Sequence, residues 1–168
     1  MHECHVVSGP PAAGKTTVAR RLASEIGGCL LDSDQVADRL VRAGMELAGL
    51  DPEDRDSPEY KRAYRAAVYE TLFDLAVANL PRVPVVIAGP FTAEGADPEW
   101  PERLRRRLGV EPRLHFVWCD AAERRRRIEA RGEERDRRKL ADWKGYLADR
   151  REERPVWPHR FVDTSRAE

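Results

Sequence analysis

The chain lacks several features that would place it in other classes of protein. Its longest apolar run, residues 83–91, is too short and too interrupted by proline to span a bilayer. The 30 basic and 30 acidic residues cancel, so no excess charge predicts binding to nucleic acid or anionic lipid. The cysteines Cys4, Cys29 and Cys119 lack metal-ligand spacing, and we expect reduced thiols without a disulfide or zinc. We therefore expect a cytoplasmic protein with no membrane association.

Side-chain amides are also nearly absent. Asn79, the single asparagine, is followed by leucine and proline, and Gln35 is the single glutamine. The Asn-Lys-x-Asp motif by which switch-type GTPases read guanine is therefore missing. The strand expected at residues 83–88 runs into Gly-Pro, without the acidic residues that hydrolytic motors place there. These observations exclude switch GTPases and disfavour hydrolytic motors.

What the chain does contain is a regular alternation of apolar runs and amphipathic segments. With 41% apolar residues, 168 residues suffice for one compact domain spanning 1–168. Five runs predict strands, and helical periodicity fills the segments between them: the strands are expected at residues 2–8, 29–31, 83–88, 113–119 and 160–162. The run at 83–88 shows no polar alternation, which is typical of a central parallel strand. The pattern predicts an α/β fold, a three-layer sandwich with right-handed crossovers.

The sequence also predicts where several helices begin. Asp34 is a candidate N-cap for the second helix, and Ser57 followed by Pro58 is typical of the start of a long helix. Asp120 with Glu123 three residues later predicts a capping box.

Residues 9–16 carry the complete phosphate-binding motif G-x-x-x-x-G-K-[ST], between a predicted strand and a predicted helix. Backbone N–H groups of such a loop and the helix N-terminus bind phosphate oxygens. In this motif the lysine, Lys15, reaches the β and γ phosphates, and the hydroxyl of Thr16 ligates Mg²⁺. The predicted nucleotide-binding residues are Gly9, Pro10, Pro11, Ala12, Ala13, Gly14, Lys15, Thr16 and Thr17. We expect ATP with Mg²⁺, although the motif does not separate ATP from GTP.

Two carboxylates, Asp32 and Asp34, follow the second predicted strand, at the carboxyl end of the expected sheet. On an extended segment, residues two apart share a face. A kinase needs one carboxylate to orient the acceptor hydroxyl and accept its proton, and another acid to help hold Mg²⁺. We assign the catalytic role to Asp34 and the metal role to Asp32. The alternative is that Asp34 only caps the next helix and Asp32 is a solvated loop residue.

The phosphate loop followed by Asp32 and Asp34 resembles the P-loop small-molecule kinases of the nucleoside-monophosphate-kinase-like fold, such as shikimate and gluconate kinases. The chain is also similar to chloramphenicol phosphotransferase and to polynucleotide-kinase-like AAA ATP-binding proteins. This resemblance implies a P-loop NTPase fold with a parallel sheet of order 2-3-1-4-5. After the third strand, residues 89–92 (Gly-Pro-Phe-Thr) replace the glycine triplet of shikimate kinases, so the resemblance does not name the acceptor.

Residues 121–138 form an arginine-rich segment with Gly132 as the predicted break in its helix. In this fold class a lid follows the fourth strand, and its guanidinium groups neutralise charge that develops during transfer. Arg131 and Arg135 flank the break and are the candidate catalytic arginines. Arg124, Arg127 and Arg138 fit an exposed helix with Glu-Arg pairs. An arginine patch could instead bind a phosphorylated acceptor or a nucleic-acid backbone.

Two classes of function follow from these motifs. The first is an ATP-dependent phosphotransferase that moves the γ-phosphate to a hydroxyl of a small molecule. A 5′-hydroxyl polynucleotide kinase is a variant of this class that the neutral total charge disfavours. The second is a nucleotide-binding regulatory protein or slow ATPase without an acceptor. Neither the acceptor nor the oligomeric state can be read from the sequence.

Weaker candidates complete the sequence prediction. Phe91, Trp100 and Trp143 either line the acceptor pocket or belong to the core, and aromatics at helical spacing are more often core. Three histidines (His5, His115 and His159) are separated along the chain, lack ligand spacing and receive no chemical role.

Overall fold

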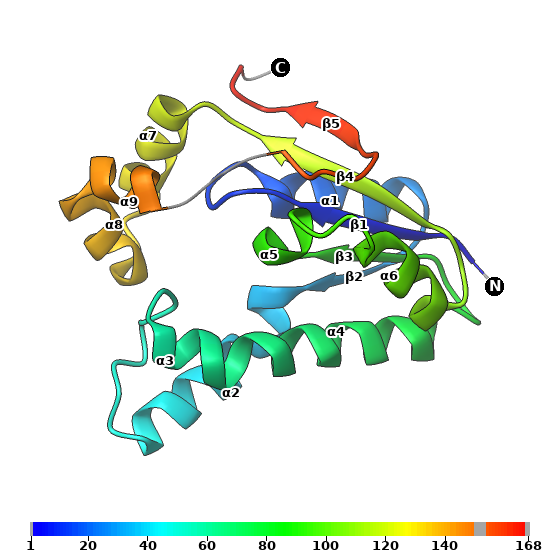
Figure 1. Ribbon diagram of the computed structural model, residues 1–168, viewed down its shortest axis with the longest axis horizontal. Helices are drawn as coiled ribbons and strands as arrows, with labels where there is room; N and C mark the ends of the chain where they lie inside the picture. The colour runs from blue at the N-terminus through cyan, green and yellow to red at the C-terminus, as the bar shows by residue number, and fades with distance from the viewer. Residues whose placement is uncertain (1, 150–153, 167–168) are drawn as a thin grey trace.

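The computed structural model describes residues 2–149 and 154–166, without the side chains of Arg138 and Asp149. Its centre is a five-stranded parallel sheet in the order β2-β3-β1-β4-β5 (Figure 1). The strands are β1 (Cys4–Ser8), β2 (Cys29–Asp32), β3 (Val85–Ala88), β4 (Pro112–Trp118) and β5 (Arg160–Asp163). The predicted α/β class, strand number and order 2-3-1-4-5 are confirmed.

β1 is the middle strand, so the loop that follows it emerges from the centre of the sheet. Val6 is in register with Ile87 of β3 on one side and with Leu114 of β4 on the other. Every residue of β1 and of β3 is buried. Within the run at residues 83–88, Val85–Ala88 thus forms a strand covered on both faces, as predicted.

Helices cover the two faces of the sheet and form the outer layers. α1 (Lys15–Glu25) contacts β1, β2 and β3 on one face, whereas α4 (Ala66–Asn79) and α6 (Trp100–Leu108) cover the other. Because side chains alternate along a strand, Val86 packs with the α1 core cluster and Ile87 with the α4 and α6 cluster.

The remaining elements gather at the carboxyl ends of the strands. In Figure 1, α7, α8 and α9 lie beyond these ends on one side, and α2 and α3 lie on the other. Their bounds are α2 (Ser33–Leu47), α3 (Pro58–Tyr60), η1 (Lys61–Arg65), α5 (Thr92–Gly95), α7 (Ala121–Arg131), η2 (Glu134–Asp136), α8 (Arg137–Ala141) and α9 (Trp143–Asp149).

The long helix predicted from Ser57 onward is present but not uniform. Ser57 Oγ accepts a hydrogen bond from the backbone N–H of Tyr60 at 3.1 Å, so the predicted N-cap is confirmed. The segment Lys61–Arg65 (η1) between α3 and α4 is a π-helix. Such a segment, which is often found at functional sites, is invisible to periodicity arguments that assume 3.6 residues per turn.

Two predicted caps need correction. Asp34 is not the N-cap of α2, because β2 extends to Asp32 and the carboxylate of Asp32 accepts from the N–H groups of Asp34 at 3.0 Å and Gln35 at 3.4 Å. The pair therefore straddles the strand–helix junction rather than sharing an extended segment. Asp120 caps α7 by accepting from Glu123 N at 2.9 Å. The carboxylate of Glu123 binds arginines instead of closing the box, since the N–H of Asp120 donates to Ser165.

The aromatic candidates for a pocket lie in or beside the core. Phe91 is 1% exposed and packs against Tyr69, Phe73 and Trp100. Its backbone is left-handed, with φ 43°, and its N–H donates to Tyr69 Oη at 3.2 Å. A bulky residue in this conformation is uncommon, and its ring is held by burial in the cluster. Trp143 is half-buried and stacks on Tyr146.

Folding brings together two of the histidines that the sequence separates. His5 and His115 lie on β1 and β4, with stacked rings and 2.9 Å between Nδ1 of His5 and Nε2 of His115. Burial, together with the nearby His5 and arginine charges, lowers the pKa of His115 to about 4. The pair is therefore neutral at pH 7 and belongs to the packing of the sheet.

The three cysteines form no disulfide bonds in the structure. Cys4 and Cys119 are buried free thiols, and Cys29 is a half-buried one.

Within residues 2–149 and 154–166, no helix is long and apolar enough to cross a membrane.

Candidate active site

The phosphate loop joins β1 to α1 and is shaped by three left-handed residues, Gly9, Ala12 and Gly14. A Cβ on Gly9 would lie 2.1 Å from the carbonyl oxygen of Val117, so only glycine fits this close approach to β4. Gly14 is the N-cap of α1 and supplies no side-chain hydrogen bond to the first turn. The helix N-terminus therefore presents uncapped N–H groups of the kind that bind phosphate oxygens.

Lys15 stands at the start of α1, and its Nζ donates to the carbonyl of Pro10 at 2.7 Å. Burial lowers the pKa of Lys15 to about 8, against the opposing effect of the Asp34 and Asp32 carboxylates. The charge of Arg131 acts in the same direction as burial. An anion placed beside Lys15 would offset this cost, which is what a phosphate at the loop would do.

Thr16 and Asp32 bring two oxygen ligands together. Thr16 Oγ1 donates to Asp32 Oδ2 at 2.8 Å, and Asp32 is 6% exposed. Mg²⁺ prefers such hard oxygen ligands and is commonly held by one or two protein groups together with substrate phosphates. No cluster of three or more His, Cys, Asp or Glu that could hold a metal occurs in the described part of the chain. The pair thus fits a magnesium ion that is shared with a nucleotide.

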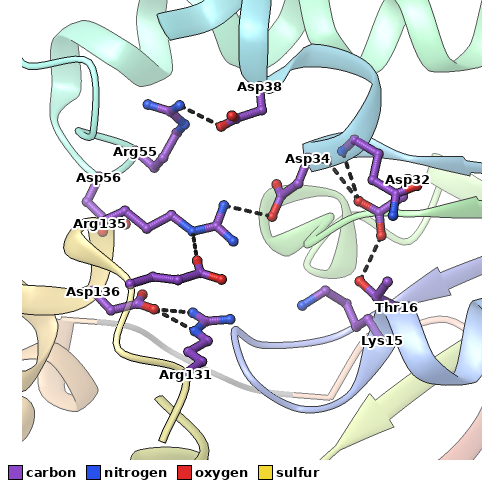
Figure 2. Close-up of polar contacts among 12 residues, drawn as sticks. Lys15, Thr16, Asp32, Asp34, Asp38, Arg55, Asp56, Arg131, Arg135 and Asp136 are labelled. Atoms are coloured by element: carbon purple, nitrogen blue, oxygen red, sulfur yellow. Dashed lines mark hydrogen bonds and ion pairs between the residues drawn. The ribbon is translucent and has the colours of Figure 1, made fainter. Parts of the chain in front are cut away.

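Asp34 is the second residue of α2 and points into the space between the phosphate loop and the lid (Figure 2). Its carboxylate is 65% exposed, and Oδ2 accepts a hydrogen bond from Nη1 of Arg135 at 3.1 Å. This contact joins residues 101 positions apart in the sequence. The candidate base and one candidate lid arginine therefore meet directly.

The second candidate arginine, Arg131, is the last residue of α7, where Gly132 ends the helix in a left-handed conformation. Its Nε donates to Oδ2 of Asp136 at 2.6 Å, and its Nη2 contacts the same oxygen. Figure 2 shows Arg131 between Asp136 and Lys15. The predicted helix break is confirmed, and it places both arginines around the same opening.

The other lid arginines differ from the exposed helix expected for them. Arg124 is 1% exposed and lies 5.8 Å from the ring centroid of Trp143. Arg127 reaches the phosphate loop, where it donates to the carbonyl of Ala12 at 3.4 Å and to Thr164 Oγ1 at 3.1 Å. The expectation of an exposed, ion-paired face is therefore wrong for Arg124 and incomplete for Arg127. The side chain of Arg138 lies outside the described residues.

These groups line one cleft of about 400 Å³ at the carboxyl end of the sheet. Of the predicted residues it includes Pro11, Ala12, Gly14, Lys15, Thr16, Thr17, Asp32, Asp34, Arg131 and Arg135. The remaining predicted residues, Gly9, Pro10 and Ala13, form the base of the loop and do not line the cleft.

The structure adds a wall of the cleft that no sequence motif predicts. Opposite the lid, the cleft is lined by residues from the loop before α3, from α3 and from the π-helical segment: Arg55, Asp56, Tyr60, Lys61 and Arg65. From the lid side comes Lys139, which is 7% exposed. The sequence signal that could have pointed to Lys139 is the scarcity of lysine, since the chain has four lysines among 30 basic residues.

The sheet order and the complete phosphate loop after β1 define a P-loop domain, and the arginine-rich segment 121–138 borders its cleft. The chain belongs to the AAA domain family (AAA_33), whose model matches residues 5–152. The predicted resemblance to P-loop small-molecule kinases is confirmed at this level.

Individual relatives support the same assignment. The chain is 37% identical to shikimate kinase of Saccharopolyspora erythraea over 133 residues, 69% of this chain and 74% of that protein. It is 43% identical to cytidylate kinase of Paramagnetospirillum magneticum over 74 residues, 44% of this chain and 32% of that protein. A crystal structure from Chloroflexus aurantiacus shares the fold, with a TM-score of 0.71, 22% identity and coverage of 98% of this chain and 86% of that one.

Proposed function

We propose that this protein is a magnesium-dependent ATP phosphotransferase that acts on a hydroxyl group of a small molecule. The observation that carries the proposal is the position of Asp34, which shares a cleft with Lys15 and is hydrogen-bonded to Arg135 of the lid. The relatives named as shikimate kinase and cytidylate kinase support the reaction class. Their different names leave the acceptor of this chain open.

Each residue has a role in the proposed transfer. The acceptor hydroxyl oxygen forms a bond to the γ-phosphorus, the bond from that phosphorus to the β–γ bridging oxygen breaks, and ADP leaves. Asp34 orients the hydroxyl and accepts its proton on a carboxylate oxygen. Lys15 and the lid arginines stabilise the charge that develops on the phosphoryl oxygens. Bound Mg²⁺, held through Thr16 and Asp32, would neutralise phosphate charge.

Asp34→Asn is a sharp test because Asp34 does not cap α2. The exchange leaves the capping carboxylate of Asp32 in place; it removes a first-turn acid, worth about 0.3–1 kcal/mol to the helix, and the charge of the exposed pair with Arg135. We expect phosphate transfer from ATP to fall by roughly 10² to 10⁴, with thermal stability and MgATP affinity retained. Asp74→Asn, which alters an aspartate with a 77% exposed side chain paired with Arg107, is the matched control.

The assay follows labelled γ-phosphate into a panel of hydroxylated metabolites and 5′-hydroxyl oligonucleotides. Transfer to one small molecule, lost in Asp34→Asn and kept in Asp74→Asn, supports the proposal. Transfer to oligonucleotides alone would make the protein a polynucleotide kinase. Hydrolysis of ATP that no compound accelerates would support the slow ATPase alternative, and full transfer by a folded Asp34→Asn protein would overturn the assigned base.

A further inference from the structure

One buried carboxylate beside the cleft does not line it, yet it binds two cations that do. Asp136 is 1% exposed and is not among the cleft-lining residues, whereas Arg131 and Lys139 are. Its Oδ2 accepts from Arg131, and its Oδ1 accepts from Nζ of Lys139 at 2.8 Å. Each carboxylate oxygen thus serves a different cation.

The contact to Arg131 fixes the orientation of the guanidinium group. Nε and Nη2 both contact Oδ2 of Asp136, so one edge of the planar guanidinium group is bound to the carboxylate. For Nη1 of Arg131 no hydrogen bond to another described residue is found, and the plane of the group lies between Asp136 and Lys15 (Figure 2). The free edge is therefore held in a set direction at the cleft, where a phosphoryl group beside Lys15 would meet it.

Stability alone is a weak reason for this arrangement. Removing a carboxylate from water is costly, and a buried ion pair seldom stabilises more than well-packed apolar side chains would. Burial tends to raise the pKa of Asp136, but the hydrogen bond from Lys139 and the charges of Lys139 and Arg131 outweigh it and leave the pKa below its ordinary value. The carboxylate is thus charged at pH 7, and it holds a guanidinium and an ammonium group side by side that would otherwise repel each other.

The partners of Arg135 provide the contrast. Arg135 binds Asp34 and Glu133, whose side chains are 65% and 43% exposed, and such exposed pairs exchange readily with water and ligands. Arg131 has a partner that is 1% exposed. Lys139, on the other oxygen of that partner, also lies 3.5 Å from Asp56 on the opposite wall. One buried carboxylate therefore orders both the nucleotide side and the acceptor side of the lid.

We infer that Asp136 is a positioning residue that presets Arg131, rather than Arg135, as the arginine acting on the phosphoryl group during transfer. The inference rests on the proposed function. It identifies the arginine that acts and the group that orients it.

The first test is a double-mutant cycle with steady-state kinetics. Asp136→Asn should lower kcat by about 10- to 100-fold while the KM for MgATP changes by less than about threefold, since the oriented guanidinium acts on charge that grows in the transition state. In an Arg131→Ala background, Asp136→Asn should have little further effect on kcat. Additive losses, or a wild-type kcat in a folded Asp136→Asn protein, would overturn the inference.

A control and a second variant guard against loss of folding. Glu134→Gln breaks the exposed pair with Arg137 in the same turn, and it should leave kcat and KM unchanged. Arg131→Lys keeps the positive charge and leaves Asp136 unchanged. Lysine has one donor nitrogen, so it cannot bind Asp136 with one edge and a phosphoryl group with the other, and its kcat should approach that of Arg131→Ala. Retention of full kcat in Arg131→Lys would show that orientation is unimportant and would overturn the inference, whatever Asp136→Asn does.

Failure of the proposed function can be recognised separately, because phosphoryl transfer to water also uses Arg131. All variants are therefore assayed with acceptor and for ATP hydrolysis without it. If no acceptor is found but hydrolysis falls in Asp136→Asn and Arg131→Lys, the acceptor assignment fails and the positioning role stands. A wild-type protein that neither transfers nor hydrolyses the γ-phosphate would overturn both.

Discussion

The phosphate loop and the lid hold their charged groups in different ways. The loop is fastened through its backbone: Ala13 N–H donates to the carbonyl of Pro10, and Thr164 donates to the carbonyl of Ala13. The lid is held by ion pairs between side chains, from the buried Arg131–Asp136 contact to the exposed Arg135–Asp34 contact. The loop is therefore held by bonds to its own backbone, whereas the lid is held by side-chain pairs, some of them exposed to solvent.

The largest effect is expected from a substitution in the phosphate loop. Lys15→Ala removes the ammonium group and its bond to the Pro10 carbonyl but leaves the backbone bond from Ala13 to Pro10 that shapes the loop. We expect MgATP binding to be abolished in calorimetry and turnover to be lost, while circular dichroism and the melting temperature remain close to wild type. Unchanged ATP affinity in this variant would show that the nucleotide binds elsewhere.

An intermediate effect is expected on the lid side. Alanine at Arg131 or Arg135 should lower kcat by about 10² or more at one of the two positions, with a modest change in nucleotide affinity, because lid arginines act mainly on charge in the transition state. Nucleotide affinity by calorimetry and kcat by phosphate transfer separate the two effects. Wild-type kcat in both single variants and in the double variant would remove the lid from the mechanism.

The smallest expected effect concerns the protonation of Lys15. Burial lowers the pKa of its amine to about 8, from 10.5, and bound phosphates favour the charged form. MgATP affinity should therefore be constant below pH 8 and should weaken as pH rises through about 8, by up to tenfold per pH unit, with proton uptake on binding. Calorimetry between pH 7 and 9.5 in two buffers of different ionisation enthalpy measures both. A constant affinity over this range would contradict the assigned role of burial.

The same contrast explains what the sequence could predict. The loop is a local motif, so spacing alone predicts a phosphate loop from Gly9 to Thr16, and the resemblance implies the strand order. The N-cap of α2 was misassigned to Asp34 because aspartate caps equally well two residues earlier, and only the observed bonds from the N–H groups of Asp34 and Gln35 to the Asp32 carboxylate decide between them. The contact between Arg135 and Asp34 spans 101 positions, and no local pattern specifies such a pair.

The sequence also does not predict which of its charged side chains are buried. An arginine-rich helix predicts a solvated face on average, yet Arg124 is 1% exposed and packs near Trp143. Phe91 was expected at the pocket or in the core, and its side chain, 1% exposed within the aromatic cluster, lies in the core. Both outcomes depend on tertiary neighbours rather than on intrinsic preference.

The π-helical segment Lys61–Arg65 has a consequence for how this family can change. Its hydrogen bonds run from residue i to i+5, so it accommodates one residue more than an α-helical turn. Lys61 and Arg65, its two ends, both line the cleft, whereas the next helix keeps Leu72 and Phe73 in the core. A single insertion or deletion here would rotate this wall of the cleft without shifting the packed helix behind it. Related chains can thus diverge in the shape of the cleft while the sheet, the loop and the core stay the same.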